Sequence, residues 1–573
     1  MSIFNLDKTS CIGTVQAVDT ANVVVGVENE DVLSSVKVNN LIIIRASKER
    51  QTLIGMVNKI IRKFNGVMQD DKEDKEDKED EEDITTDDIV RINLIGTLLD
   101  KKGTKSNIFK RTLESVPEIG AECYVMNDDN LAKFMGVISS VSKDDADPLN
   151  IGTYALSKHA QAYLDGNKFF QKHAVIVGST GSGKSCTVAT IIEQIALLKS
   201  ANAILFDIHG EYSPITGNNI KHYKIAGPND TYADEVLFLP YWILTYEEMM
   251  SMMLDRGDNN APNQAMLFSK TVLEKKKDFL LSNGIESIVD DITIDSPIPY
   301  EMNSLIKQFY DYNMEMVDGS KGKKKGPYNG LLSRFIQRLE NKINDKRLNF
   351  MFSQDEQLLK YDYMEELCQK LLSSASNGGG IKIIDFSEVP SDILPLIVSL
   401  IARIVFTIQQ WTNKDKIHPI AIFCDEAHLY IPQNVSLGIE SLSLMSFERI
   451  AKEGRKYGVG LVVITQRPSE VDRTVLSQSS NFVAMRLTNS DDQNVIKKLL
   501  PDSLGNFGDL LPVLDVGEAI VVGDASLLPS RILINRPNPE PNSSTVKFWD
   551  EWSKERSEDA ITEAVNSMRR QSR

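Results

Sequence analysis

The chain has 573 residues, of which 42% are hydrophobic and 25% are charged. This balance is typical of a globular protein, and at about 150 residues per domain the length predicts two to four domains. The formal net charge of −17 excludes a histone-like protein that coats nucleic acid with its whole surface, because phosphate binding needs a basic surface. The run Asp70–Asp83 holds eleven acids and three lysines and contributes −8 of that charge. A basic channel inside an acidic shell therefore stays compatible with the composition.

The cysteines and the apolar segments favour a cytoplasmic protein. The five cysteines form no CxxC pair, which argues against a disulfide framework or a zinc site and indicates a reducing compartment. The N-terminus shows no signal-peptide pattern. The most apolar stretch, residues 394–408, is interrupted by Ser399 and Arg403, so it predicts a buried core helix and not a membrane span. We expect a cytoplasmic protein with no membrane partner.

Residues 1–145 predict a small β-barrel. Short runs rich in Val and Ile are separated by Asn, Asp and Gly, which is typical of a barrel or sandwich. The predicted strands lie within residues 12–27, 36–46, 89–100 and 121–138. Residues 69–88 include the acidic run and are low in complexity, so they predict a disordered, solvated loop. A role of this loop as a nucleic-acid mimic is the alternative.

From residue 146 the sequence predicts an α/β domain with a mainly parallel sheet, because short apolar strands alternate with helical segments. The first part of this core covers residues 146–240 and the second covers 381–535. Residues 241–380 have helical periodicity and predict a helical insertion, with an exposed loop at 319–327. Residues 536–573 predict a charged, helical C-terminal tail.

A phosphate-binding loop is the most specific motif in the chain. It matches G-x-x-x-x-G-K-[ST] and lies between an apolar strand and a helix. Glycines in such a loop allow successive backbone N–H groups to point at phosphate oxygens, and the helix N-terminus adds positive potential. The predicted nucleotide-binding residues are Gly178, Ser179, Thr180, Gly181, Ser182, Gly183, Lys184, Ser185 and Cys186. Lys184 would reach the β- and γ-phosphates of ATP, and Ser185 would ligate Mg²⁺.

Two later strand ends supply partners for this loop. Asp425 and Glu426 follow the apolar strand 420–424, at the edge of the sheet where ligands bind in open α/β folds. Asp425 would hold the Mg²⁺ shell and Glu426 would activate the attacking water. Gln466, which follows Thr465 at the end of another strand, is a candidate sensor of the γ-phosphate or a water-orienting residue.

Five segments, in this order, resemble the HerA-type ATPases of the HerA–FtsK division of P-loop motor proteins. They are HAVIVGSTGSGKS, FDIHGEY, IFCDEAHLYIP, IAKEGRKYGVGLVVITQRP and NFVAMRLTNSDD. The resemblance implies a RecA-like core, a homo-hexameric ring, ATP hydrolysis at subunit interfaces and translocation of double-stranded DNA. Where family members often carry an arginine before the first strand, this sequence has Lys172, which offers a point charge and not a planar fork.

The resemblance also implies roles for further residues. Asp207 and Glu211, in FDIHGEY, match the family motif close to the nucleotide, and His209 between them is more often an ordinary loop residue. Arg455 is the first candidate for an arginine finger acting on a neighbouring subunit, and Arg449 is the second. Contacts with DNA are predicted from two basic runs, Lys275–Lys277 and Lys321 with Lys323–Lys325, although such runs are more often solvated faces.

Several functions stay open at this level. The leading hypothesis is an ATP-driven DNA motor with an effector on its N-terminal barrel, either a nuclease or a sirtuin-like NAD-consuming subunit, in anti-phage defence. A motor for DNA end resection paired with a NurA-like nuclease is the second setting. An ATP-dependent scaffold that recruits and activates a partner enzyme is the alternative from another class. A kinase is disfavoured, because the acidic pair and the TQRP segment indicate hydrolysis.

Overall fold

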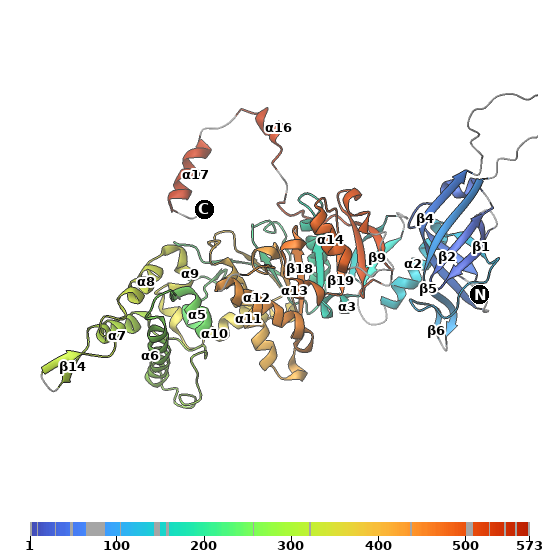
Figure 1. Cartoon of the computed structure of the whole chain (residues 1–573). Helices are drawn as coiled ribbons and strands as arrows, with labels where there is room; N and C mark the ends of the chain where they lie inside the picture. Colours follow the sequence, from blue (N-terminus) through green and yellow to red (C-terminus); the bar gives the residue numbers. More distant parts are fainter. Residues whose placement is uncertain are drawn as a thin grey trace, which may run out of the picture. The chain divides into compact units, whose positions relative to one another are not determined.

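The computed structural model describes residues 3–7, 10–28, 30–45, 50–64, 86–102, 105–142, 149–155, 160–255, 257–319, 322–435, 438–499, 508–526, 528–543, 546–555 and 559–570. The chain forms two compact units. The first comprises residues 1–169 and 481–535, and the second comprises residues 170–480 and 536–573. Figure 1 shows the elements of both units along the chain.

The N-terminal strands of the first unit close into a barrel, as predicted. The strands are β1 (Cys11–Asp19), β2 (Asn22–Val27), β3 (Leu41–Arg45), β4 (Gln51–Phe64), β5 (Thr86–Lys102), β6 (Lys105–Lys110) and β7 (Glu122–Val125). Their order is β2-β1-β7-β3-β4-β5-β6, and an additional β2–β5 pairing closes the ring. Alternate apolar side chains, among them Ile12, Val23, Ile42 and Ile92, fill its interior. Closure removes the exposed edges of the strands in the ring, which are otherwise sites of unwanted pairing, while β6 lies outside the ring beside β5.

Two predictions for this region are corrected. The strand predicted at 121–138 ends at Val125, and helix α2 (Asp128–Ser142) follows. Two acids in the first turn of α2 suit a helix N-terminus, and Leu131, Phe134, Met135 and Ile138 bury one helical face. The predicted acidic loop 69–88 falls mostly outside the described residues, but its last residues belong to β5, where Asp88 pairs with Arg62 at 3.2 Å.

The rest of the first unit is a small antiparallel sheet. It contains β8 (Leu149–Tyr154), β9 (Gln161–Leu164), β19 (Asn481–Ala484), β20 (Glu518–Gly523) and β21 (Ser530–Ile534). The order is β19-β20-β21-β8-β9. The first unit also contains the short helices α1 (Glu30–Ser35) and α14 (Ser490–Leu499), and α3 (Gly166–Gln171) begins in it.

The second unit is built on a parallel sheet, as predicted. Its strands are β10 (Ala174–Val177), β11 (Ala203–Asp207), β12 (Ile220–Ile225), β13 (Val236–Leu237), β16 (Ile381–Asp385), β17 (Ile420–Cys424) and β18 (Val459–Thr465). The order is β13-β12-β16-β11-β17-β18-β10. Helices α4 (Lys184–Ala196), α11 (Leu394–Trp411), α12 (Ile439–Glu453) and α13 (Arg473–Ser477) belong to this core. Parallel strands place their carboxyl ends at one edge of the sheet, so the segments after β10, β11, β17 and β18 meet there.

Helix α11 is long and apolar enough to pass for a membrane span, yet most of it is buried in the protein. Arg403, which interrupts its apolar sequence, forms a bidentate pair with Glu248, with N–O distances of 2.8 and 2.9 Å. Glu248 also closes a capping box with Thr245 at the start of α5 (Tyr246–Met253). The prediction of a buried core helix is confirmed, and its one charge ties the insertion to the core.

The helical insertion contains α5, α6 (Ala261–Ser282), α7 (Met302–Met314), α8 (Ser333–Ile343), α9 (Asn349–Phe352) and α10 (Tyr363–Leu372). These helices lie together at one end of the second unit (Figure 1). The exposed loop predicted at 319–327 is largely a hairpin of β14 (Met316–Gly319) and β15 (Gly322–Lys325), which projects from them. A strand forms here despite the charged sequence because Met316 and Val317 pair across from Lys325 and Lys324.

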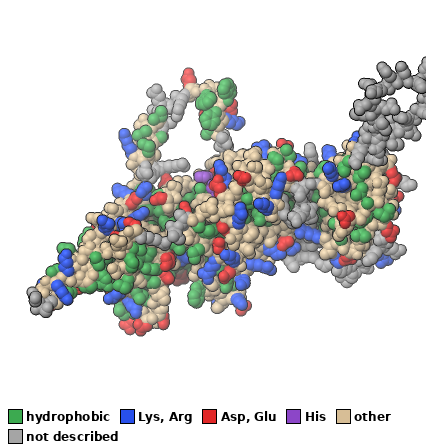
Figure 2. All heavy atoms as spheres, in the orientation of Figure 1, with side chains coloured by type: hydrophobic (Ala, Val, Ile, Leu, Met, Phe, Trp, Pro, Cys, Tyr) green, Lys and Arg blue, Asp and Glu red, His purple; other side chains and the backbone are tan. Residues whose placement is uncertain are grey.

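The tail carries two short helices, α16 (Phe548–Trp552) and α17 (Asp559–Arg570). Phe548, Trp549 and Trp552 are all exposed, and they form a cluster of hydrophobic side chains on α16 (Figure 2). The predicted charged helical tail is thus present as two helices, α16 and α17.

Candidate active site

The phosphate-binding loop joins β10 to α4 with the geometry that anion binding requires. Gly181 and Gly183 have φ angles of 72° and 107°, a left-handed backbone that favours glycine. Lys184 opens α4 with a side chain that is only 9% exposed. The Ser182 hydroxyl is buried without a hydrogen-bond partner among the described residues. A buried hydroxyl without a partner in such a loop can donate a hydrogen bond to a phosphate oxygen of a bound nucleotide.

Asp425 and Glu426 lie directly after β17, two sheet positions from β10. Both are buried, and Asp425 accepts a hydrogen bond of 3.0 Å from the backbone N–H of Glu426. Burial raises the pKa of Asp425 well above its usual range, and the nearby carboxylates of Glu426 and Glu211 act in the same direction, while Lys184 opposes them. A divalent cation would relieve this crowding of negative charge, so the residues fit a Mg²⁺ ion.

The backbone of Glu426 is strained. Its φ of 46° and ψ of 44° place a non-glycine residue in the left-handed region, at a cost of about 1 to 3 kcal/mol. The carboxylate Oε2 is buried and has no hydrogen bond among the described residues, although His428 Nδ1 lies 3.3 Å away. An unpaired carboxylate oxygen at the end of a strand is suited to accept a proton from a water molecule.

The turn after β11 supports Ser185. The two carboxylate oxygens of Asp207 accept the backbone N–H groups of Glu211 and Tyr212, both at 2.9 Å. Glu211 Oε2 in turn accepts a hydrogen bond of 2.8 Å from the Ser185 hydroxyl. Burial raises the pKa of Asp207 to about 6. The structure therefore brings Glu211 to the phosphate loop, whereas Asp207 shapes the turn that presents it, and His209 in the same turn is exposed.

Gln466 reaches the phosphate loop from the end of β18. Its Oε1 accepts a hydrogen bond of 2.7 Å from the Thr180 hydroxyl. The residue before it, Thr465, is buried, and its hydroxyl lies 3.3 Å from His428 Nδ1. The predicted residues of three strand ends, after β10, β17 and β18, thus lie together.

The sequence did not indicate two further contributors. His428 lies between Glu426 and Thr465, which stand 39 residues apart in the chain, so local pattern could not reveal the contact. The start of the tail also reaches the site, since the backbone N–H of Asn542 donates to the Glu211 carbonyl at 2.7 Å and that of Asn538 donates to Glu193 at 2.7 Å. Glu540 and Arg536 of the same segment influence the half-buried Cys186, whose pKa is raised, mainly by burial.

The two arginine candidates differ in their surroundings. Arg455 lies in the tight turn η8 (Gly454–Tyr457), where a Cβ on Gly454 would meet the Val459 carbonyl at 2.5 Å. Its side chain is exposed and makes no hydrogen bond or ion pair within the described part of the chain. Arg449 stacks over the Phe406 ring at 5.0 Å and donates to Gln410 at 3.1 Å. Of the two, Arg455 is the one whose charge lies in solvent, whereas Arg449 is engaged with Phe406 and Gln410.

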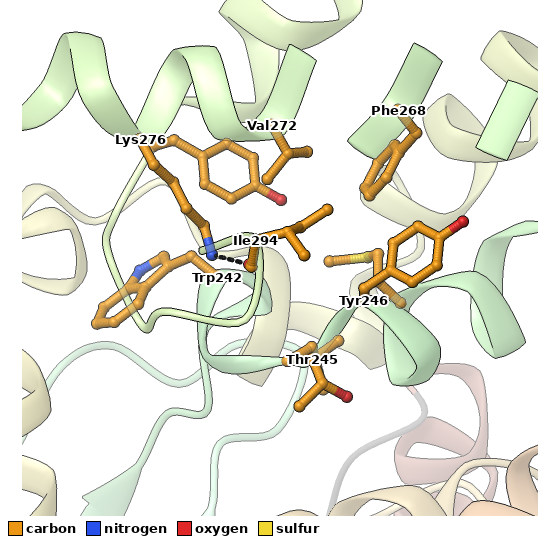
Figure 3. Close-up of a pocket in the computed structure, with 10 residues that line it drawn as sticks. Trp242, Thr245, Tyr246, Phe268, Val272, Lys276 and Ile294 are labelled. Atoms are coloured by element: carbon orange, nitrogen blue, oxygen red, sulfur yellow. Dashed lines mark hydrogen bonds between the residues drawn. The ribbon is translucent and has the colours of Figure 1, made fainter. Parts of the chain in front are cut away.

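The predicted DNA-contact lysines of α6 do not form a basic surface. Lys276 is 1% exposed and donates hydrogen bonds of 2.6 Å to the carbonyls of Ile294 and Ser296, in a pocket lined by Trp242 and Phe268 (Figure 3). Its prediction as a DNA contact is wrong, because one face of α6 packs into the insertion. Lys275 and Lys277 pair with Asp278 and Asp290, at 4.0 and 3.9 Å.

In contrast, Lys323, Lys324 and Lys325 are exposed along β15. Lys321 lies outside the described residues. Of the two predicted basic runs, the one on the hairpin therefore has its described lysines exposed to solvent.

A phosphate loop at the end of one parallel strand, an acidic pair two strands away and a glutamine on the strand between them define a P-loop ATPase. Residues 149–405 match the family model described as the central domain of the helicase HerA. Over these residues the resemblance to HerA-type ATPases predicted from the motifs is confirmed.

Two sequence relatives, each matched over most of its own length, agree with this resemblance. The DNA double-strand break repair helicase HerA of Saccharolobus solfataricus is 24% identical over 405 residues, which cover 70% of this chain and 71% of that protein. A probable helicase of Methanocaldococcus jannaschii is 24% identical over 550 residues, which cover 92% of this chain and 95% of that protein. Among solved structures, the plasmid coupling protein TrwB has a TM-score of 0.44 at 13% identity and covers 70% of this chain and 92% of its own.

Proposed function

We propose that the protein is a ring-forming, ATP-driven motor that moves along double-stranded DNA. The observation that supports the proposal is the site itself, where the buried Glu426 Oε2 and the Ser182 hydroxyl of the phosphate loop both lack a hydrogen bond in the described part of the chain. The names of the HerA relatives supply the DNA substrate, since they describe helicases that act in double-strand break repair.

The residues divide the hydrolysis of ATP among them. The loop backbone and Lys184 would hold the phosphates, and Gln466, which accepts a hydrogen bond from Thr180, would orient a water molecule. The oxygen of that water attacks the γ-phosphorus while Glu426 accepts one of the water's protons. The bond between the γ-phosphorus and the β-phosphate oxygen breaks in the same step. Mg²⁺, held by Ser185 and Asp425, would neutralise charge that develops on the phosphates. Arg455 would come from the neighbouring subunit of a homo-hexamer and stabilise the same charge.

Contact with DNA is proposed for the hairpin lysines Lys323–Lys325. Basic and acidic side chains are interspersed on the face shown in Figure 2, so a uniform positive coat is not the mode of binding. A translocating protein needs contacts with phosphates and not with base edges, and three solvated lysines on a projecting strand suit that need.

For the partner we favour a nuclease of the NurA type that docks on the N-terminal barrel, in DNA end processing. The repair function in the relatives' names supports this setting. Val116 and Ile119, exposed in the segment before β7, offer the barrel an apolar contact. A sirtuin-like NAD-consuming partner and a role in anti-phage defence stay predictions from the sequence. The cytoplasm is the compartment in which such a motor would work.

Glu426→Gln tests the proposal. The neutral amide keeps the shape of the side chain but cannot accept a proton, so hydrolysis should fall by a factor of about 10² to 10⁴ while ATP still binds. In the wild type, duplex DNA should stimulate hydrolysis, and in the variant both hydrolysis and movement along DNA should stop. A scaffold would instead assemble and activate its partner enzyme with this variant. Hydrolysis that ignores duplex DNA in the wild type would contradict the motor.

A further inference from the structure

One ring nitrogen in the active site faces two possible partners. His428 Nδ1 lies 3.3 Å from Glu426 Oε2 and 3.3 Å from the Thr465 hydroxyl. All three residues are largely buried, so solvent offers no easy substitute for either contact. Thr465 directly precedes Gln466, whose amide oxygen holds Thr180 in the phosphate loop. A chain of contacts therefore runs from the phosphate loop through β18 and His428 to the carboxylate.

The single nitrogen cannot serve both partners in the same way. In a neutral imidazole, Nδ1 is either a donor or an acceptor, never both. As an acceptor it receives the Thr465 O–H, and the Glu426 oxygen is left without a donor. As a donor it binds the Glu426 carboxylate, and the lone pair that the Thr465 hydroxyl would use is gone. Burial lowers the pKa of His428, which favours the neutral ring that makes this choice necessary.

The heavy-atom contacts fit the first of these arrangements. Glu426 Oε2 is buried with no hydrogen bond among the described residues, while the Thr465–His428 contact is present. The Thr465 oxygen also accepts the backbone N–H of Arg467 at 3.0 Å, which fixes the hydroxyl at the end of β18. A hydroxyl held in this way has its hydrogen available for His428.

We propose that His428 is a positioning residue shared between Thr465 and Glu426, and that Thr465 keeps Glu426 free to accept a proton by engaging the ring nitrogen. The inference rests on the proposed role of Glu426. Gln466, which contacts the phosphate loop, and Thr465, which contacts His428, are adjacent residues at the end of β18. The phosphate sensor and the base are thus linked within one subunit.

Thr465→Val tests the link, because it removes the hydroxyl and keeps the branched shape. Without Thr465 the ring nitrogen turns to Glu426, so kcat for ATP hydrolysis should fall about tenfold, while KM for ATP changes less than about twofold. Thr465→Ser should restore kcat. Thr271→Val is the matched control, since Thr271 is equally buried and donates to a helical carbonyl at 2.8 Å in the insertion. This control should leave kcat unchanged.

A double variant distinguishes positioning from a purely structural role. In a His428→Ala background no nitrogen competes for the carboxylate, so adding Thr465→Val should change kcat less than about twofold. Additive losses, an unchanged kcat in Thr465→Val, or a joint loss of kcat and ATP binding that Ser does not restore would each overturn the inference. If His428→Ala does not fold, the Ser rescue and the split between kcat and KM decide. Failure of Glu426→Gln to abolish hydrolysis would overturn the role of the base instead, whatever Thr465 does.

Discussion

The Ser185 hydroxyl donates a hydrogen bond of 2.8 Å to Glu211 Oε2, which joins the phosphate loop to the turn after β11. A serine that donates its hydrogen keeps its oxygen lone pairs, so this bond leaves Ser185 able to ligate a cation. Glu211 therefore contacts the predicted Mg²⁺ ligand Ser185 through this hydrogen bond and fixes the orientation of its hydroxyl. Outer partners of this kind commonly affect metal affinity by a factor of 10 to 100.

Glu211→Ala should consequently raise the Mg²⁺ concentration that gives half-maximal ATP hydrolysis by roughly tenfold or more. The measurement is a Mg²⁺ titration of hydrolysis at a fixed, saturating ATP concentration. Glu193→Ala, on the outer part of α4 where Glu193 accepts the Asn538 N–H, is a matched control and should leave the titration unchanged. Equal shifts in both variants would show that Glu211 has no special relation to the cation.

The phosphate loop and the acidic pair could be predicted because each is a local pattern with a fixed place in a parallel sheet. The spacing of Gly178, Gly183 and Lys184 marks the loop, and Asp425 with Glu426 follows a recognisable apolar strand. Parallel pairing then requires these strand ends to meet at one edge. The parallel sheet and the barrel could also be predicted, because short runs of apolar residues separated by turn residues are local patterns as well.

What the sequence did not reveal depends on contacts between distant residues. Lys276 lies between two other lysines, and only tertiary packing shows that its side chain enters the pocket beside Trp242. The contact that distinguishes His428 is with Thr465, at the end of β18, far from it in the sequence. The hydrophobic pattern of residues 128–142 is compatible with a strand or a helix, and the burial of one helical face favours the helix α2.

Arg455→Ala should abolish most hydrolysis while preserving ATP binding, because an arginine finger contributes about 10³ to 10⁵ in rate. Arg449→Ala should change hydrolysis far less, since Arg449 is engaged with Phe406 and Gln410. The measurements are steady-state hydrolysis and nucleotide binding on purified oligomers.

Mixing variants shows whether Arg455 acts between subunits. An Arg455→Ala subunit keeps an intact site, and a Glu426→Gln subunit keeps an intact arginine. Mixed oligomers should thus hydrolyse ATP faster than either variant alone. Activity no higher than the mean of the two parents would contradict an arginine supplied in trans.

The hairpin lysines give a prediction for DNA binding. Replacing Lys323, Lys324 and Lys325 with Ala should weaken binding to any duplex sequence and reduce the dependence of log K on log salt by up to about three. DNA-independent hydrolysis should not change. The control is the triple variant Lys270→Ala, Lys277→Ala and Lys370→Ala, which removes the same charge from lysines already paired with acids. An equal effect of the two triple variants would mean that only net charge matters.

Lys382 predicts a dependence of stability on pH. Its ammonium group is fully buried in β16, donates to Asn202, Gly380 and Ser373 at 2.6, 2.8 and 3.0 Å, and has a pKa lowered to about 7, mainly by burial. The unfolded chain keeps this lysine protonated up to about pH 10.4. Between these values the unfolded state binds more protons than the native state, so stability rises with pH.

Relative to Lys382→Met, the free energy of unfolding of the wild type should therefore increase by about 2 kcal/mol between pH 7 and pH 9. The variant removes the ionisation, so the difference between the two proteins isolates this one group from all other titrations. Urea unfolding of both proteins at closely spaced pH values measures it. The variant also leaves three oxygen acceptors without their donor, which lowers its stability at every pH. A difference that stays constant from pH 7 to pH 9 would show that Lys382 keeps its proton in the folded protein, held by those three acceptors.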